Sequence, residues 1–171
     1  NFKMKTKPVS DRMYSLVVLY DMHTNFFNKA IDGILDKDAQ SRLNTKANHA
    51  AWLAGSFIQE RMDLANLLSG SDLKQSADDL FKNHQGIKDE VQYPSMADFR
   101  KDADKAAPAL REVLMNITDE KLDSVFEMPE VPEMKMPYFD LIAFMTYREA
   151  NLIGQIILWR RLLGYEGIKY D

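Results

Sequence analysis

The feature that most constrains this chain is the spacing of its apolar residues, which recur every three or four positions in four long segments. This period places them on one face of an α-helix, and no segment shows the sustained two-residue alternation typical of a β-strand. The expected helices cover residues 11–34, 44–69, 95–117 and 137–163. Four amphipathic helices of roughly 20 residues indicate a four-helix bundle. We therefore expect an all-α protein with one domain over residues 1–171, in which residues 1–7 are flexible.

Capping residues mark several of the expected helix ends. Ser10 and Ser95 precede two of the helices, and a serine hydroxyl in this position accepts a hydrogen bond from a free backbone N–H of the first turn. Gly70 and Gly164 follow two of them, and glycine readily adopts the left-handed conformation that ends many helices.

The segments between the helices differ in character. The stretch 71–94 is long enough for a crossover between the second and third helices, and we expect a short helix in it over residues 76–82. Residues 128–137 hold three prolines and are expected to form an extended linker. Pro108 lies inside the segment 95–117 and removes one backbone donor, so we expect a kink or break there.

Composition excludes several classes of function. The formal net charge of −4 argues against nucleic-acid binding, which needs a concentrated basic surface. The chain has no cysteine, which excludes disulfides, thiolate nucleophiles and cysteine-ligated zinc. The N-terminal apolar run, residues 16–20, is too short for a signal peptide, and no window approaches the roughly 20 apolar residues of a membrane span. We expect a soluble cytoplasmic protein without nucleic-acid or membrane partners.

Polar residues interrupt the apolar face of the last helix. Arg148 and Gln155 fall on the same stripe as Leu152, which is expected to face inward. A buried guanidinium without a partner costs several kcal/mol. Arg148 must therefore find a carboxylate, an anion or water.

The segment 44–69 carries a matching polar strip. Its residues are either the solvated face of the helix or the lining of a pocket, and the pattern alone gives these two interpretations about equal weight. If they line a pocket, Arg148 is expected to pair with Glu60 or Asp63, or to bind an anionic ligand. The candidate pocket residues from this helix are His49, Trp52, Ser56, Gln59, Glu60 and Asp63.

Three stretches resemble the DinB-like superfamily, whose members are metal-binding four-helix bundles. These are Trp52-x-x-Gly55 with Ser56 directly after it, Tyr93-Pro-Ser95, and Gly154-Gln155 with the tail that follows at residues 160–167. The resemblance covers about 130 residues, from the second helix to the tail. The family's three metal-binding histidines correspond to Ser56, Arg148 and Leu152. A hydroxyl, a permanent cation and an alkyl chain do not hold a divalent ion, so no metal and no cofactor are expected.

The resemblance leaves other positions with two interpretations. Glu149 keeps the family's residue and is either a satisfied polar neighbour or a base. His23 and His49 are candidates for a relocated ligand role, although a lone histidine is more often a hydrogen-bonded structural residue, and His84 is expected on the surface. Gly154 is expected where two helices approach closely.

Two functions follow from these expectations. The favoured one is a non-catalytic bundle that binds a small anionic molecule or only dimerises. The alternative is a degenerate thiol transferase, metal-independent or with a relocated metal, related to the bacillithiol- and mycothiol-dependent enzymes. In that case Ser56 and Arg148 would orient a thiol or carboxylate substrate. The resemblance also implies a homodimer.

Overall fold

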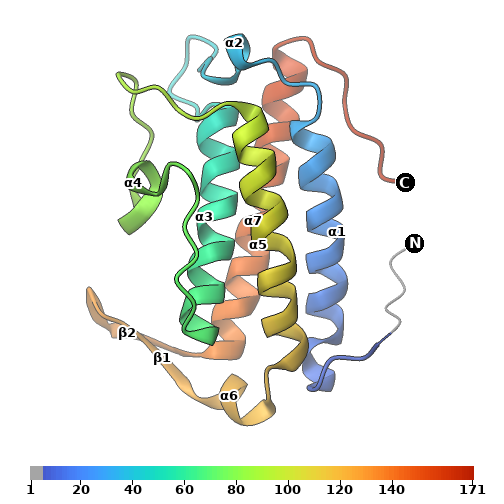
Figure 1. Cartoon of the computed structure of the whole chain (residues 1–171), viewed down its shortest axis with the longest axis vertical. Coiled ribbons are helices and arrows are strands. Elements are labelled where there is room, and N and C mark those ends of the chain that lie inside the picture. Colours follow the sequence, from blue (N-terminus) through green and yellow to red (C-terminus); the bar gives the residue numbers. More distant parts are fainter. Residues whose placement is uncertain (1–5) are drawn as a thin grey trace.

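The computed structural model describes residues 6–171 and is mostly helical, with one small two-stranded sheet (Figure 1). The helical class is confirmed, whereas the expectation of no strands is wrong. Of the segment expected to be flexible, residues 1–5 lie outside the described residues. In chain order the elements are η1 (Asp11–Met13), α1 (Tyr14–Ile31), α2 (Asp36–Ala39), α3 (Ala50–Ser69), α4 (Asp78–Phe81), η2 (Lys82–His84), α5 (Met96–Asn116), α6 (Asp119–Asp123), β1 (Val125–Met128), β2 (Val131–Pro137) and α7 (Tyr138–Leu162).

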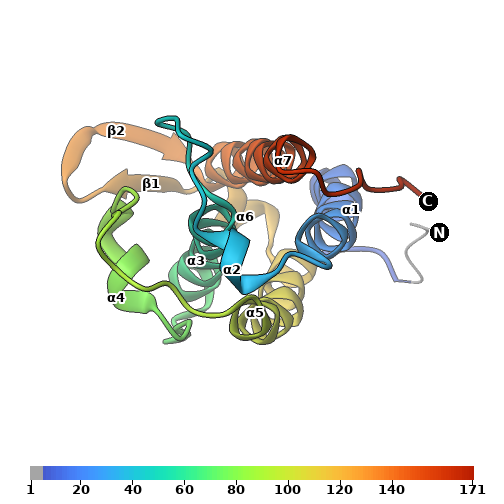
Figure 2. The same ribbon diagram turned by 90° about the horizontal axis from the view of Figure 1, so that it is seen from above.

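The four long helices α1, α3, α5 and α7 lie side by side (Figure 2). Both α1 and α3 pack against α5 and α7. Figure 1 shows α1 and α7 running in one direction and α3 and α5 in the other. Because α3 and α5 run the same way, the connection 70–95 returns along the outside of α3 to the end where α3 began.

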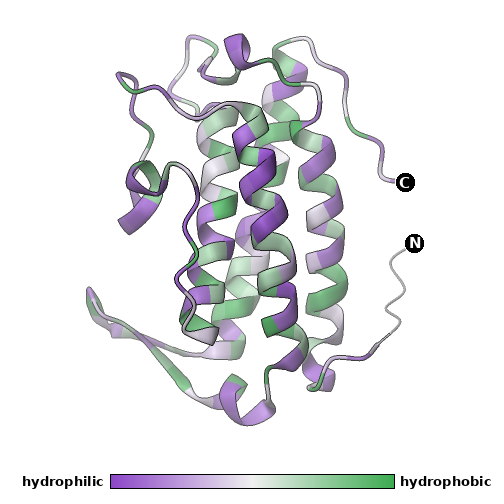
Figure 3. Ribbon diagram, viewed as in Figure 1, coloured by the Kyte–Doolittle hydropathy of each residue, from purple (hydrophilic) through white to green (hydrophobic). Residues whose placement is uncertain are grey.

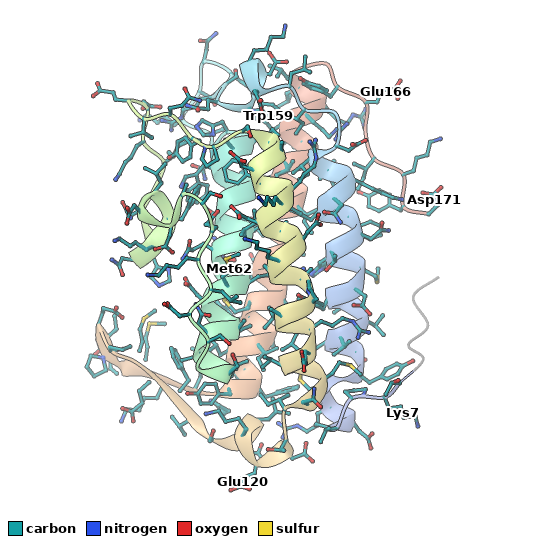
Figure 4. The ribbon with its side chains drawn as sticks, viewed as in Figure 1. Lys7, Met62, Glu120, Trp159, Glu166 and Asp171 are labelled. Carbon is teal, nitrogen blue, oxygen red and sulfur yellow. The ribbon has the colours of Figure 1, made fainter. Side chains whose placement is uncertain are left out.

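Apolar side chains fill the space between the long helices in two clusters. One includes Phe27 and Phe57, whose rings stack with centroids 4.0 Å apart and tie α1 to α3. Met62 of α3, labelled in Figure 4, belongs to the same cluster and is buried. The second cluster is centred on Val17, Leu114 and Ile142, nearer the other end of the helices. Hydrophilic stretches on the visible side of α5 mark its solvent-facing surface (Figure 3).

Two helix boundaries differ from the prediction. The second long helix begins at Ala50 and not near residue 44, because Leu43 and Asn44 have φ of 58° and 56°, outside the helical range. Its N-cap is His49, and it ends at Gly70 with φ of 74°, as expected. The first helix stops at Ile31 instead of residue 34, and its first three residues form the 3-10 turn η1, which Ser10 caps.

The helix α5 continues through Pro108, so it is not broken there, and the kink expected as the alternative stays a prediction. Its N-cap is Ser95, whose hydroxyl accepts a hydrogen bond of 3.1 Å from the backbone N–H of Asp98. A proline removes one helical hydrogen bond, but burial of Phe99 and Leu114 on either side holds the helix against its neighbours.

The proline-rich segment before the last helix is a β-hairpin and not an extended linker. β1 and β2 are antiparallel, with Val125 opposite Pro137. Both strands are edge strands, where proline is tolerated because an outward N–H would not join the ladder. Phe126 packs edge-on against Tyr138 with ring centroids 5.8 Å apart, which anchors the hairpin to the start of α7.

Close approach to a neighbouring element occurs at Gly55 and not at Gly154, where it was expected. Gly154 is exposed, and a Cβ built there would meet nothing within 4 Å, so the expectation of close helix approach within the chain is wrong. A Cβ at Gly55 would instead lie 2.0 Å from the ring of Phe81. Gly55 therefore lets α4 sit directly on α3.

Candidate functional site

A pocket of about 110 Å³ lies between α3, α7 and the segment around α4 and η2. The helix α3 contributes a row of side chains three or four residues apart, which is the spacing of one helix face. The ring of Phe81 reaches the pocket because Gly55 has no side chain to hold α4 away. The lining residues are Trp52, Ser56, Gln59, Glu60, Asp63, Phe81, His84, Gln85 and Arg148.

The structure brings six of the predicted site residues to this pocket. Five come from α3, and Arg148 comes from α7, so only the packing of α7 against α3 puts them together. The polar strip of α3 is thus a pocket lining and not a fully solvated face. The six are Trp52, Ser56, Gln59, Glu60, Asp63 and Arg148.

Arg148 forms an ion pair with Glu60, with Nε and Oε1 3.1 Å apart. This confirms the prediction that the guanidinium pairs with a carboxylate. Both side chains are partly exposed, Arg148 at 31% and Glu60 at 19%. Burial raises the pKa of Glu60, and the charge of Arg148 opposes that rise.

Asp63 borders the same pocket without a cationic partner. Its Oδ1 accepts a hydrogen bond of 3.0 Å from Gln59 Nε2, which also donates to Asp78 Oδ1 at 3.2 Å. Burial raises the pKa of Asp63, and the hydrogen bond from Gln59 opposes this. When Glu60 and Asp63 are both ionised, the charge of Glu60 balances that of Arg148. The charge of Asp63 then gives the pocket a net charge of −1.

Two buried polar atoms on the pocket's side chains have no hydrogen-bond partner within residues 6–171. They are the indole nitrogen of Trp52 and Oε2 of Glu60, a donor and an acceptor. Buried polar groups are nearly always hydrogen-bonded, so each such atom calls for an explanation.

Four predicted site residues lie elsewhere. Leu152 is fully buried in the apolar core, and Gln155 is exposed and donates to Asn151. His49 caps α3, where its Nδ1 accepts a hydrogen bond of 3.1 Å from the backbone N–H of Trp52. The fourth, Glu149, lies in the interior, because adjacent residues on a helix point about 100° apart and Arg148 faces the pocket.

The pKa of His49 is lowered from 6.5 to about 4, chiefly by burial and to a smaller extent by the nearby charge of Arg42. The neutral ring is the form that fits its position, since an imidazolium has no lone pair to accept the Trp52 N–H. His49 is therefore a structural cap and not a ligand.

A buried ion cluster, formed by Arg61, Glu149 and His23, joins three of the long helices. Arg61 of α3 donates from Nε to Glu149 of α7, and His23 Nδ1 of α1 lies 3.1 Å from the other carboxylate oxygen. The Arg61 guanidinium also stacks over the rings of Tyr20 at 3.9 Å and Phe57 at 4.5 Å. Burial raises the pKa of Tyr20, so its hydroxyl stays protonated.

The cluster resolves two open interpretations and adds one residue that the sequence did not indicate. Glu149 is a satisfied polar neighbour, and His23 is hydrogen-bonded to it. Arg61 was missed, although a charge placed between Ile58 and Leu64 on an apolar stretch is a usable signal. The cavity beside this cluster is about 10 Å³, close to the smallest space that holds one water.

His84 is exposed, as expected, yet it borders the pocket, which sequence reasoning did not anticipate. Across residues 6–171, no three acidic or histidine side chains are placed to hold a metal ion together. Within the same residues, no helix has both the length and the apolar character to cross a membrane. Comparison with protein-family models finds no match, and comparison with curated proteins finds none either.

Proposed function

We propose that this chain is a DinB-like four-helix bundle, with a crossover between α3 and α5, that binds a small molecule without metal or catalysis. The ligand carries an anionic group that contacts Arg148. The observation that carries this proposal is the guanidinium of Arg148 on the wall of an open pocket of about 110 Å³. Only Nε is engaged, by Glu60, and the two terminal nitrogens have no hydrogen-bond partner within the described residues. A guanidinium so placed offers the paired donors that carboxylates prefer.

Asp63 sets a second requirement on the ligand. Only Oδ1 of its carboxylate accepts a hydrogen bond, from Gln59, so Oδ2 can accept one from a ligand. The negative charge of the carboxylate repels a ligand that has an anionic group and no hydrogen-bond donor. A small amino acid or hydroxy acid provides a carboxylate for Arg148 and donors for Asp63. Such a molecule fits the pocket better than acetate or phosphate.

The test is calorimetric titration with glycine, glycolate, acetate and phosphate, repeated with Arg148→Leu. Because a hydrogen bond to a charged group contributes about 1.5–3 kcal/mol, the variant is expected to bind at least about tenfold more weakly. Arg111→Leu is the matched control, since its ion pair with Asp21 is similarly exposed but lies away from the pocket. The proposal fails if none of the four compounds binds, or if Arg148→Leu binds as tightly as the parent.

The same proposal includes a cytoplasmic location and a homodimer, without nucleic-acid or membrane partners. The acidic net charge and the lack of cysteine support the location and the absence of nucleic acid. Light scattering coupled to size-exclusion chromatography measures the oligomeric state directly.

A further inference from the structure

The helix α7 exposes an apolar stripe on the side away from the other long helices. Phe144, Tyr147, Leu158 and Leu162 are 52%, 61%, 61% and 65% exposed. They recur at intervals of three, four or eleven residues, so they share one face of the helix. Arg148, four residues after Phe144 and 31% exposed, borders this stripe, whereas the four exposed apolar residues and the positions Asn151 and Gly154 between them are uncharged.

An exposed glycine lies in the middle of the stripe. Gly154 has open space around its Cα, and nothing within the described chain requires a glycine there. Glycine is less favourable than alanine inside a helix, so its presence needs a reason. A glycine on an outer face leaves a shallow depression into which a side chain from another molecule can fit.

The exposed stripe of α7 in one copy of the chain is complementary to the same stripe in a second copy when the two helices run antiparallel. When two copies of one helix pair antiparallel about a two-fold axis, each residue lies opposite a different residue of the other copy. The mean of the two sequence numbers is then the same for every such pair. Asp140 with Arg161, and Tyr147 with Gly154, share the midpoint 150.5, and Phe144 with Leu158 has the midpoint 151. The three midpoints agree within half a residue, or about 0.8 Å along the helix.

Each of these pairs is chemically matched. Asp140 and Arg161 are of opposite charge, and neither has an ion-pair partner within residues 6–171. In that antiparallel arrangement the exposed ring of Tyr147 would face the open space at Gly154, and exposed Phe144 would face exposed Leu158. Asn151 is next to the midpoint. Within the chain its amide donates to Tyr147 and accepts from Gln155, which leaves one further donor hydrogen and one further lone pair for its own copy.

We propose that two copies of this chain associate through α7, antiparallel about a two-fold axis beside Asn151. The inference rests on the proposed homodimer and adds its surface and register. It does not depend on the ligand, because Asp140, Asn151 and Arg161 do not border the pocket.

Because the chain has no cysteine, one introduced thiol reports the register without interference. Asn151→Cys is treated with diamide, which oxidises two thiols to a disulfide and is itself reduced to the hydrazine. Rapid and nearly complete formation of a covalent dimer is expected, because the two residues 151 face each other across the axis. Lys101→Cys, on the exposed side of α5, is the matched control and is expected to cross-link only slowly.

A charge exchange at the two exposed ends of α7 provides a second test. Asp140→Arg and Arg161→Asp each place like charges opposite one another, and each is expected to raise the dimer dissociation constant about two- to fivefold. The double variant restores the pair and is expected to return the constant to that of the parent. Analytical ultracentrifugation measures all four proteins.

The outcomes separate the two proposals. A monomeric parent overturns both the homodimer and this surface. The surface is overturned, and the homodimer stays in place, if the parent is dimeric but Asn151→Cys cross-links no faster than Lys101→Cys. The same holds if the dissociation constant of the double charge variant does not return to that of the parent. Rapid cross-linking together with recovery supports the surface and its register.

Discussion

Single residues in this protein take their roles from what burial does to their charge. His49 is 2% exposed and accepts a backbone hydrogen bond, so its neutral form is the one that stabilises α3. Arg148, whose side chain is about one-third exposed, forms an ion pair with Glu60. The two residues differ in function because a histidine can lose its proton near neutral pH, whereas an arginine does not.

His49 predicts a specific pH dependence of stability. Its pKa is lowered from 6.5 to about 4, so its contribution is fully present above pH 6.5 and is lost as pH falls toward 4. The loss amounts to roughly 2–3 kcal/mol. His49→Asn keeps an N-cap acceptor that does not titrate, and its free energy of unfolding is expected to depend less on pH over this range.

Urea unfolding between pH 4 and pH 7 measures this difference. His84→Asn is the control, because His84 is exposed and asparagine tolerates its φ of 57°. An unchanged pH profile for His49→Asn would show that His49 does not titrate as its burial implies.

Secondary-structure elements depend on how well they pack as well as on their own sequence. The helix α5 continues through Pro108 although proline is unfavourable inside a helix. The hairpin β1–β2 forms from a proline-rich segment because its strands are edges and because Phe126 packs on Tyr138. In both cases tertiary contacts outweigh the local preference.

Pro108→Ala is therefore expected to stabilise the protein, by about 1–3 kcal/mol, because the substitution restores a backbone donor on an exposed helix position. Thermal and urea unfolding measure the change. Lys105→Ala, also exposed on α5, is the control and is expected to change stability by less than about 0.5 kcal/mol. A destabilised Pro108→Ala would mean that proline is required for a bend in α5.

At the scale of the whole molecule, the buried ion cluster fixes the relative positions of α1, α3 and α7. Arg61, Glu149 and His23 each come from a different helix. Their hydrogen bonds are directional, unlike the apolar contacts around them, so they select one register among the three helices.

Glu149→Gln is expected to destabilise the fold by about 3–5 kcal/mol, because it leaves the charge of Arg61 buried without a counterion. The double variant Arg61→Met with Glu149→Leu removes both charges and is expected to cost less than either single change. Urea unfolding of the single and double variants forms the measurement. Arg111→Leu, which breaks the partly exposed pair with Asp21, is expected to cost under about 1 kcal/mol. Equal losses in all the variants would contradict this account.

The amino-acid sequence by itself determined the four long helices and their caps at Ser95 and Gly70, because helical period and capping are local properties. It left Glu60, Asp63 and an anionic ligand open as partners of Arg148, and the packing of α7 against α3 selected Glu60. The tertiary structure decided the start of α3, the hairpin and the members of the pocket. Arg148 and Glu149 are neighbours in sequence, yet one faces the pocket and the other the interior. Only the packing of α7 against α1 and α3 sets which side of a helix is inside, since the free energy of burial depends on all the surrounding side chains.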